Sequence, residues 1–388
     1  MNKPRHFWIL AGEASGDMYG ARLARELQAL AAAEGRQITL AGMGGPAMGQ
    51  VPGFDRKVDS TELGVMGVVE VLKLLFTFIG IYFKLVRAAR KARPEAVVLI
   101  DYPGFNLMFA LAMYFSRIPV IWYVCPHLWV WGKWRLPVLA RICTRMLVIF
   151  PFEEEVFAPT PLKAEFVGHP LLDLMAEKHD PTIKRDPDCV LLLPGSRVME
   201  ITRLMPPMLQ TVKALARKHP ELHFVLSAPR EKILRLCTEY YEQARAQDPD
   251  FPVIELVTGQ TSRYQQEAGT GLAASGTVTV ESAIAGLPLV VVYRMNSVTL
   301  FLASFVVKLY RGFFTMVNII LNRELFQEFL QNKVTPEYLV PALEKILPGG
   351  ERRKEVEDGM KEMTELLSPN SSSAIRQAAE HCWTIQPK

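Results

Sequence analysis

Arg197 follows a proline-glycine turn that ends a short apolar run. The run, residues 190–193, predicts a buried strand, and Gly195, Ser196 and Arg197 come directly after Pro194. Free backbone N–H groups in such a turn, together with a guanidinium, suit a phosphate or diphosphate, because arginine offers a rigid pair of donors. The alternative is an ordinary strand-ending turn with a surface arginine.

A second candidate phosphate contact consists of Ser275, Gly276 and Thr277. These small residues follow an apolar run at 270–273 and precede a predicted helix, so an anion can approach the positive end of the helix dipole. Glu281 lies one helical turn further on, where its carboxylate can accept hydrogen bonds from a ribose diol. Together with Arg197, these residues predict a pocket for a nucleotide-diphosphate sugar in the C-terminal half.

Asp101 is the candidate general base. It follows the apolar run at 96–100, and a carboxylate at the carboxyl end of a parallel strand points to where α/β sheets bind ligands. The alternative is that Asp101 caps the next helix. Pro103 and Gly104 come before the helix resumes, which leaves the carboxylate free for other work.

The residues from Gly12 to Asp17 form a polar loop between an apolar strand at 7–11 and a helix. Because strand-to-helix loops hold the ligands of α/β sheets, this junction and the one near residue 275 predict two α/β domains that face a shared cleft. Such a cleft would bring two substrates together. Glu13, Ser15 and Asp17 are therefore candidates for binding the acceptor.

Residues 125–135 combine three tryptophans, a histidine and two cations. Tryptophan-rich loops often lie at an interface between water and lipid. Lys133 and Arg135 are candidates for binding an acceptor phosphate. His127 is equally consistent with a contact to the acceptor and with a hydrogen-bonded structural role.

Apolar runs and helical stretches alternate along most of the chain, which is typical of parallel sheets. Because 388 residues exceed what one hydrophobic core usually holds, we expect two Rossmann-like domains. We expect residues 1–170 to form the acceptor and membrane-binding domain and residues 171–365 the nucleotide-sugar-binding domain. Residues 366–388 form a helix that packs back on an N-terminal domain. The polar stretch 177–188 is the best linker candidate.

The predicted helix at 70–91 carries a narrow charged stripe on an otherwise apolar surface. One interpretation is a buried core helix with one solvated edge. The other is a helix at a membrane surface or along an acyl-chain groove, with its basic residues near anionic head groups. Its uncharged stretch is roughly half of the ~20 residues that a spanning helix needs. The acyl or membrane candidates are Leu74, Phe76, Phe78, Ile79 and Phe83.

Several classes of function are disfavoured. The net charge of +4 is modest and does not by itself indicate nucleic acid. The five scattered cysteines indicate a reducing compartment, and the first apolar run is too short for a signal peptide, so we expect a cytoplasmic protein. The glycine spacings do not fit a dinucleotide fingerprint. Asp186-Pro-Asp188 and Asp248-Pro-Asp250 are expected to be loops rather than metal sites, and no metal is predicted.

Taken together and in order, these motifs closely resemble those of the lipid-A-disaccharide synthase family. The resemblance spans residues 7 to about 331. It implies an inverting glycosyltransferase with the GT-B fold, which needs no metal or other cofactor. The family transfers 2,3-diacylglucosamine from UDP-2,3-diacylglucosamine to 2,3-diacylglucosamine 1-phosphate, forming a β-1,6 linkage and UDP. The matching segments are 11–17, 42–45, 101–106, 129–131, 151–153, 167–169, 193–197, 274–277 with Glu281, 293–295, 317–318 and 328–331.

The resemblance also implies residue roles and a location. Asp101 matches the proposed catalytic base, Arg197 the essential arginine near the diphosphate, and Glu281 the ribose-binding acid. Asn318 matches a residue of the donor site, although Val317 replaces the proline that precedes it in the family. The family works as a peripheral protein on the cytoplasmic face of the inner membrane of Gram-negative bacteria, and an oligomer is possible.

Two other functions stay open at this point. One is a UDP-sugar transferase or epimerase that acts on a water-soluble substrate, which undiminished activity on deacylated substrates would favour. The other is a nucleotide-sugar or lipid-binding protein at the membrane surface without catalysis. The presence of both Asp101 and Arg197, each in its expected half, argues against the latter.

Overall fold

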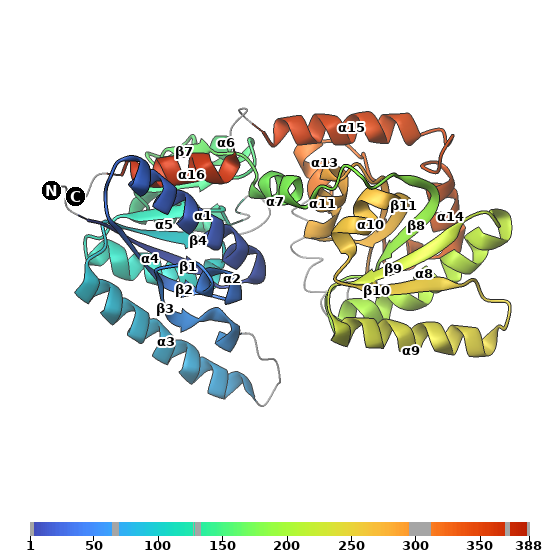
Figure 1. Ribbon diagram of the computed structural model, residues 1–388, viewed down its shortest axis with the longest axis horizontal. Helices are drawn as coiled ribbons and strands as arrows, with labels where there is room; N and C mark the ends of the chain where they lie inside the picture. The colour runs from blue at the N-terminus through green and yellow to red at the C-terminus, as the bar shows by residue number, and fades with distance from the viewer. Residues whose placement is uncertain are drawn as a thin grey trace. The chain divides into compact units, whose positions relative to one another are not determined.

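The computed structural model describes residues 4–63, 70–126, 128, 133–294, 312–368 and 373–385, of which 62–63, 70–77 and 133 are described by their backbone alone. The chain divides into two compact units. Unit 1 comprises Met1–Asp173 and Leu367–Lys388, and unit 2 comprises Leu174–Leu366. Each unit is built around one parallel sheet covered by helices (Figure 1).

The sheet of unit 1 has the strand order β3-β2-β1-β4-β5-β6-β7, with all neighbours parallel. The order reverses between β1 and β4, so the loops after these two strands diverge and leave room for a ligand. The strands are β1 (Arg5–Ala11), β2 (Ile38–Gly44), β3 (Phe54–Asp59), β4 (Ala96–Ile100), β5 (Val120–Tyr123), β6 (Arg145–Val148) and β7 (Ala164–Phe166).

Helices cover both faces of this sheet. Alternate strand residues such as Trp8, Leu99 and Trp122 form one buried core with α3, α4 and α5. The helices and 3-10 turns are α1 (Ala14–Ala33), α2 (Pro46–Gly49), η1 (Ser60–Leu63), α3 (Glu70–Ala92), α4 (Pro103–Phe115), η2 (Lys133–Arg135), α5 (Leu136–Ile142), α6 (Glu153–Phe157), α7 (Pro170–Lys178), which crosses into unit 2, and α16 (Ala374–Trp383).

The C-terminal helix α16 packs on α1 of its own chain (Figure 1). Trp383 stacks on Phe7 of β1 with ring centroids 6.1 Å apart. Arg5 donates to the Trp383 carbonyl at 3.0 Å and pairs with Glu95 at 2.6 Å. The last helix therefore completes the hydrophobic core of the unit in which the chain begins.

The sheet of unit 2 has the order β10-β9-β8-β11-β12-β13, again with parallel neighbours. Its order reverses between β8 and β11, which places a second ligand-binding edge there. Because these strands are covered on both faces, their sequences are apolar runs. The strands are β8 (Asp186–Leu193), β9 (His223–Ala228), β10 (Ile254–Thr258), β11 (Ala268–Ala274), β12 (Leu289–Tyr293) and β13 (Glu328–Leu330).

Most of the described helices of unit 2 form two groups. α8, α9 and α14 pack together, and α11, α13 and α15 form the other group. The bounds are α8 (Val198–Lys218), α9 (Glu231–Gln247), α10 (Thr261–Glu267), α11 (Thr277–Ile284), α13 (Met316–Leu321), η3 (Gln331–Lys333), α14 (Pro336–Glu344) and α15 (Arg353–Leu366).

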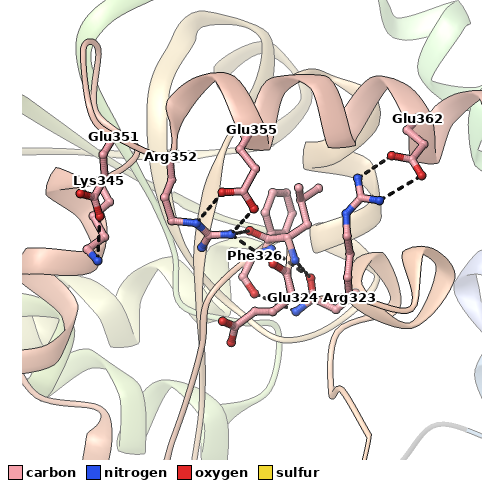
Figure 2. Close-up of polar contacts among 10 residues, drawn as sticks. Arg323, Glu324, Phe326, Lys345, Glu351, Arg352, Glu355 and Glu362 are labelled. Carbon is pink, nitrogen blue, oxygen red and sulfur yellow. Dashed lines mark hydrogen bonds and ion pairs between the residues drawn. The ribbon is translucent and has the colours of Figure 1, made fainter.

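Arginine pairs attach α15 to the loop that follows α13 (Figure 2). Arg323 forms two hydrogen bonds with Glu362, one of them 3.1 Å long. Arg352 pairs with Glu355 and donates to the carbonyls of Glu324 and Leu325 at 3.1 and 3.3 Å. The loop at 322–327 is thereby held from its α15 side.

The segments at 7–11, 96–100, 190–193 and 270–273 that were predicted to be strands all lie in strands, and the one at 96–100 has the predicted ends. The short strands β3, β7 and β13 were not predicted, because three to six residues with polar members carry little periodicity. The division between the units falls after Asp173, inside α7, close to the expected division after residue 170, and the linker candidate 177–188 runs from the end of α7 into β8. The expectation that Asp186-Pro-Asp188 is a loop was wrong, because these residues open β8 and Asp186 pairs with Ala268 of β11.

Candidate active site

A pocket of about 340 Å³ opens in unit 2 at the carboxyl ends of β8 and β11. Leu193 and Ala273 are register partners at this edge, so the loops after the two strands start side by side. Most of the predicted donor-site residues line this one pocket. Its lining residues are Leu193, Gly195, Ser196, Arg197, Glu200, Ser227, Pro229, Thr261, Ala274, Ser275, Gly276, Thr277, Val278 and Glu281.

The loop after β8 is folded around the carboxylate of Glu200. Its Oε2 accepts hydrogen bonds from the backbone N–H groups of Ser196 and Arg197 at 2.9 and 3.2 Å. A Cβ on Gly195, whose φ is +116°, would lie 2.6 Å from the same oxygen. The expectation of free amides at Ser196 and Arg197 was therefore wrong, since a carboxylate of the chain itself occupies them.

The Arg197 side chain remains available to a ligand. It is 74% exposed and donates to Oε1 of Glu200 at 2.9 Å. An exposed ion pair of this kind is worth about 0–1 kcal/mol, so an anion in the pocket can take over the guanidinium at little cost.

The other wall of the pocket is the start of α11. Ser275 continues the sheet, since its N–H donates to the Val292 carbonyl at 3.1 Å, and Gly276 then caps the helix. Thr277 and Val278 begin the helix, where the backbone N–H groups carry the positive end of the dipole. Burial raises the pKa of the Glu281 carboxyl, and the charge of Lys178 lowers it.

Sequence reasoning missed several lining residues of this pocket, four of which lie outside the predicted loops. Glu200 lies in the first turn of α8, and Ser227 lies near the end of β9. Pro229 lies in the loop after β9, and Thr261 is the first residue of α10. The hydroxyl groups of Ser227 and Thr261 are 2.7 Å apart. Ser227, Pro229 and Thr261 could have been found from the sequence because they lie at or just after the ends of apolar strands. Parallel strands end at one edge of the sheet, so residues at these ends come together.

Asn318 does not line the pocket, and its amide is used inside the fold. Its Nδ2 donates to the Phe326 carbonyl at 2.7 Å and to Glu328 Oε1 at 2.8 Å. Its Oδ1 accepts from the N–H groups of Leu325 and Phe326 at 2.8 and 2.9 Å. Because the side chain is fully buried and four hydrogen bonds saturate it, the expected donor contact is corrected to a structural link between α13 and β13.

In unit 1, Asp101 ends β4 at the point where the strand order reverses. Ala11 of β1 and Ile100 of β4 are register partners, so the loop of Glu13 and the turn of Asp101 start side by side. Burial raises the pKa of the Asp101 carboxyl, and a hydrogen bond from the Tyr102 backbone N–H acts in the opposite direction. The alternative of a helix cap is not observed, because α4 has Tyr102 at its N-cap without a side-chain cap bond.

The three acceptor candidates of the first loop differ in their surroundings. Glu13 is exposed and Ser15 is partly buried. Asp17 is buried, and its carboxylate accepts hydrogen bonds from the N–H groups of Gly45, Ala47 and Met48 at 2.7, 2.8 and 3.0 Å. These bonds fix the start of α2, so we withdraw Asp17 as an acceptor ligand.

The tryptophan-rich segment is described in part. His127 lies outside the described residues, and Lys133 begins η2 with its side chain not described. Arg135 lies over the ring of Trp134 at 5.2 Å, and Trp134 is exposed.

The apolar residues of α3 divide into two sets. Phe78 packs edge-to-face on Phe105 of α4 with ring centroids 5.1 Å apart, so it belongs to the core. Ile79 and Phe83 are exposed by 41% and 63%. Leu74 and Phe76 have side chains outside the described residues. Within the described residues, no helix combines the length and the apolar character that a membrane span requires.

The profile of the Lipid-A-disaccharide synthetase family matches residues 7–382. The chain belongs to the lipid-A-disaccharide synthase family. It is therefore a glycosyltransferase of lipid A biosynthesis, as the resemblance of its motifs implied.

Relatives and structural neighbours extend over nearly the whole chain. The lipid-A-disaccharide synthase of Myxococcus xanthus is 32% identical and covers 100% of this chain and 99% of its own. That of Acidobacterium capsulatum is 34% identical, with coverages of 98% and 96%. The S. aureus MnaA–UDP structure has a TM-score of 0.62 at 13% identity, covering 97% and 96%. The calicheamicin glycosyltransferase CalG4 has a TM-score of 0.58 at 16% identity, covering 99% and 98%. These likenesses and the two parallel sheets confirm the predicted two-domain α/β fold of the GT-B type.

Proposed function

We propose that the protein transfers 2,3-diacylglucosamine from UDP-2,3-diacylglucosamine to the 6-hydroxyl of 2,3-diacylglucosamine 1-phosphate, with inversion at C1. The family membership supports the two substrates. The observation that carries the donor assignment is the pocket of unit 2, which gathers Arg197, the start of α11 and Glu281. We assign the donor to unit 2, which contains this pocket, and the acceptor to unit 1, which contains Asp101.

On the donor side, the reaction requires stabilisation of the negative charge that develops on the diphosphate as UDP leaves. Arg197 and the N–H groups at the start of α11 can neutralise that charge as it develops on the leaving UDP. Glu281 is placed in the same pocket to accept hydrogen bonds from the ribose hydroxyls. Gly195, Ser196, Ser275, Gly276 and Thr277 shape the space around the phosphates.

On the acceptor side, Asp101 acts as the general base. It takes the proton of the 6-hydroxyl while the oxygen forms a bond to C1 of the donor. The bond from C1 to the diphosphate oxygen breaks, and UDP leaves with the electron pair. The raised pKa of the Asp101 carboxyl supports this role, because a base close to the operating pH accepts a proton more readily. Glu13, Ser15, His127, Lys133 and Arg135 remain candidates for binding the acceptor.

The test of this function is UDP release by the Asp101→Asn variant. We expect kcat to fall by about 10²–10⁴-fold, because the amide cannot accept the proton. Binding of UDP, measured by calorimetry, should equal that of the wild type. Turnover near the wild-type rate in a folded variant would remove Asp101 as the base.

We also propose that the outer faces of α3 and α4 lie against the cytoplasmic side of the inner membrane and contact acyl chains. Four exposed apolar residues support this surface: Ile79 and Phe83 on α3, and Met108 and Phe115 on α4. The Tyr82 hydroxyl donates to the Met108 carbonyl at 3.3 Å, which ties the two helices together. Basic side chains on α3 are exposed and suit anionic head groups: Lys84, Arg87, Arg90 and Lys91.

A further inference from the structure

The turn after β4 contains two consecutive residues with left-handed backbone conformation. Asp101 has φ +46° and Tyr102 has φ +49°. Residues other than glycine rarely adopt this backbone conformation, because their Cβ atom comes too close to the following carbonyl oxygen. The turn is therefore strained. Val124, which follows the neighbouring strand β5, has φ +64° and adds a β-branched residue to the same edge. Strain of this kind persists only when the surrounding structure enforces it.

Asn106 is the residue that enforces the turn. Its side chain is fully buried in the first turns of α4. Nδ2 donates to the carbonyl of Ile100 at 3.2 Å and to the carbonyl of Asp101 at 2.7 Å. The orientation of the amide is unambiguous, because only its NH₂ group can pair with two carbonyl oxygens.

These two carbonyls belong to the peptide planes on either side of the Asp101 Cα. Two peptide planes that are both fixed set the direction of the Cα–Cβ bond between them. The backbone N–H of Asn106 also donates to the Tyr102 carbonyl at 3.1 Å, which starts α4. One residue thus holds three consecutive carbonyls, those of Ile100, Asp101 and Tyr102.

The turn is also confined from the side of β1. The Tyr102 ring lies against Gly12, where a Cβ would come within 2.3 Å of the ring carbon Cδ1. Only glycine leaves room for the ring at this point. Gly12, in the loop after β1, therefore leaves the space that the Tyr102 ring occupies in this turn.

We propose that Asn106 is a positioning residue, which aims the Asp101 carboxylate by holding its backbone in the left-handed conformation. This inference rests on the proposed role of Asp101 as the general base. It goes beyond that role because it attributes part of the rate enhancement to the buried side-chain amide of Asn106, which does not contact the substrate.

The test uses two variants of the full-length enzyme. Asn106→Leu keeps the branched shape at Cγ and loses both hydrogen bonds to the carbonyls, whereas Asn106→Ser keeps one hydroxyl donor. UDP release and UDP binding are measured for both. We expect kcat to fall by about 10–100-fold in N106L, with a smaller loss in N106S, because small misplacements of a reacting group have effects of this size. The KM of the donor and the affinity for UDP should stay within about twofold of wild type, since the donor pocket is built from unit 2 alone.

Ser116→Ala is the matched control. At the far end of the same helix, the Ser116 hydroxyl donates to the Ala112 carbonyl at 2.6 Å and accepts from Arg90 Nε of α3 at 2.9 Å. This variant therefore loses both side-chain hydrogen bonds without touching the turn. Its kcat should equal that of the wild type. If N106L fails to fold, the comparison of N106S with S116A decides the question.

The failures of the two proposals can be told apart. A folded N106L with wild-type kcat, alongside an inactive D101N, overturns the role of Asn106 and leaves the base in place. Equal losses of kcat in N106S and S116A, or equal losses of kcat and UDP affinity in N106L, also overturn it and indicate a general structural role. Wild-type turnover of D101N overturns both proposals.

Discussion

The Glu200 carboxylate binds Arg197 twice, accepting from its guanidinium at 2.9 Å and from its backbone N–H at 3.2 Å. The same carboxylate holds the N–H of Ser196. Glu200 therefore orders the loop that carries the arginine. It would also compete for the guanidinium with the diphosphate of the proposed donor. These two effects can be separated by mutation.

Glu200→Ala should weaken UDP binding about tenfold, because the loop loses three hydrogen bonds that order it. Glu200→Gln should bind UDP within about threefold of the wild type, or more tightly. Its amide oxygen still accepts from the two backbone N–H groups, while the ionic competitor for Arg197 is gone. Titration calorimetry with UDP measures both. If both variants bound UDP equally weakly, hydrogen-bond acceptance by the side chain at position 200 would not be enough to order the loop, which would contradict this role.

Asn318→Ala should destabilise the protein by about 3 kcal/mol, because buried partners of the four hydrogen bonds are left unsatisfied. Denaturant titration gives this free energy of unfolding. Asn332→Ala, at an exposed position in η3, is the control and should change stability by less than about 0.5 kcal/mol. Loss of UDP affinity in a fully folded N318A, without loss of stability, would restore Asn318 to the donor site.

Asp101→Asn should raise the melting temperature at neutral pH even though it removes turnover. Burial raises the pKa of this carboxyl in the folded state above its unfolded value. The folded protein therefore bears the cost of an ionised buried carboxylate above the folded pKa and loses that cost as the pH falls below the unfolded pKa. The asparagine is neutral at every pH. Melting curves at pH 4 and pH 8 check this, and the gain from D101N should be larger at the higher pH; an equal gain at both would contradict it.

The pH dependence of kcat gives a second check on Asp101. A general base is active only when deprotonated, so kcat should fall as the pH drops through its raised pKa. We expect the acidic limb to lie above the range of an ordinary aspartate near 3.9. A limb at or below that value, for an otherwise stable enzyme, would mean that another group limits the rate.

Phe83→Ser combined with Phe115→Ser should reduce co-sedimentation with vesicles that contain anionic lipid by severalfold. The two rings are exposed by 63% and 76%, so their removal takes apolar area from the membrane contact without opening the core. Val253→Ser is the control, because Val253 is exposed by 76% on unit 2 and should leave binding unchanged. Unchanged binding in the double variant would show that this face is not the membrane contact.

Much of the donor site could be predicted because its residues are close in sequence to strand ends. Ser196 and Ser275 lie just after two apolar runs, and parallel strands end at one edge, so local pattern and location coincide. Asn318 was misassigned for the opposite reason. Its partners Phe326 and Glu328 are eight and ten residues away across a turn, and no pattern in the sequence reports that they saturate its amide.

The sequence by itself determined the alternation of strands and helices, the two loops that line the pocket of unit 2, the position of Asp101 and the family. All of these depend on short apolar runs and on the residues beside them, which local chemistry dictates. Only the tertiary structure decided which polar groups are already occupied. Glu200 fills the amides of the arginine loop, Asp17 fixes α2, and Asn106 holds a strained turn. The sequence does not reveal whether a carboxylate or an amide hydrogen-bonds to water, substrate or backbone. Those partners depend on interatomic distances that exist only in the folded chain.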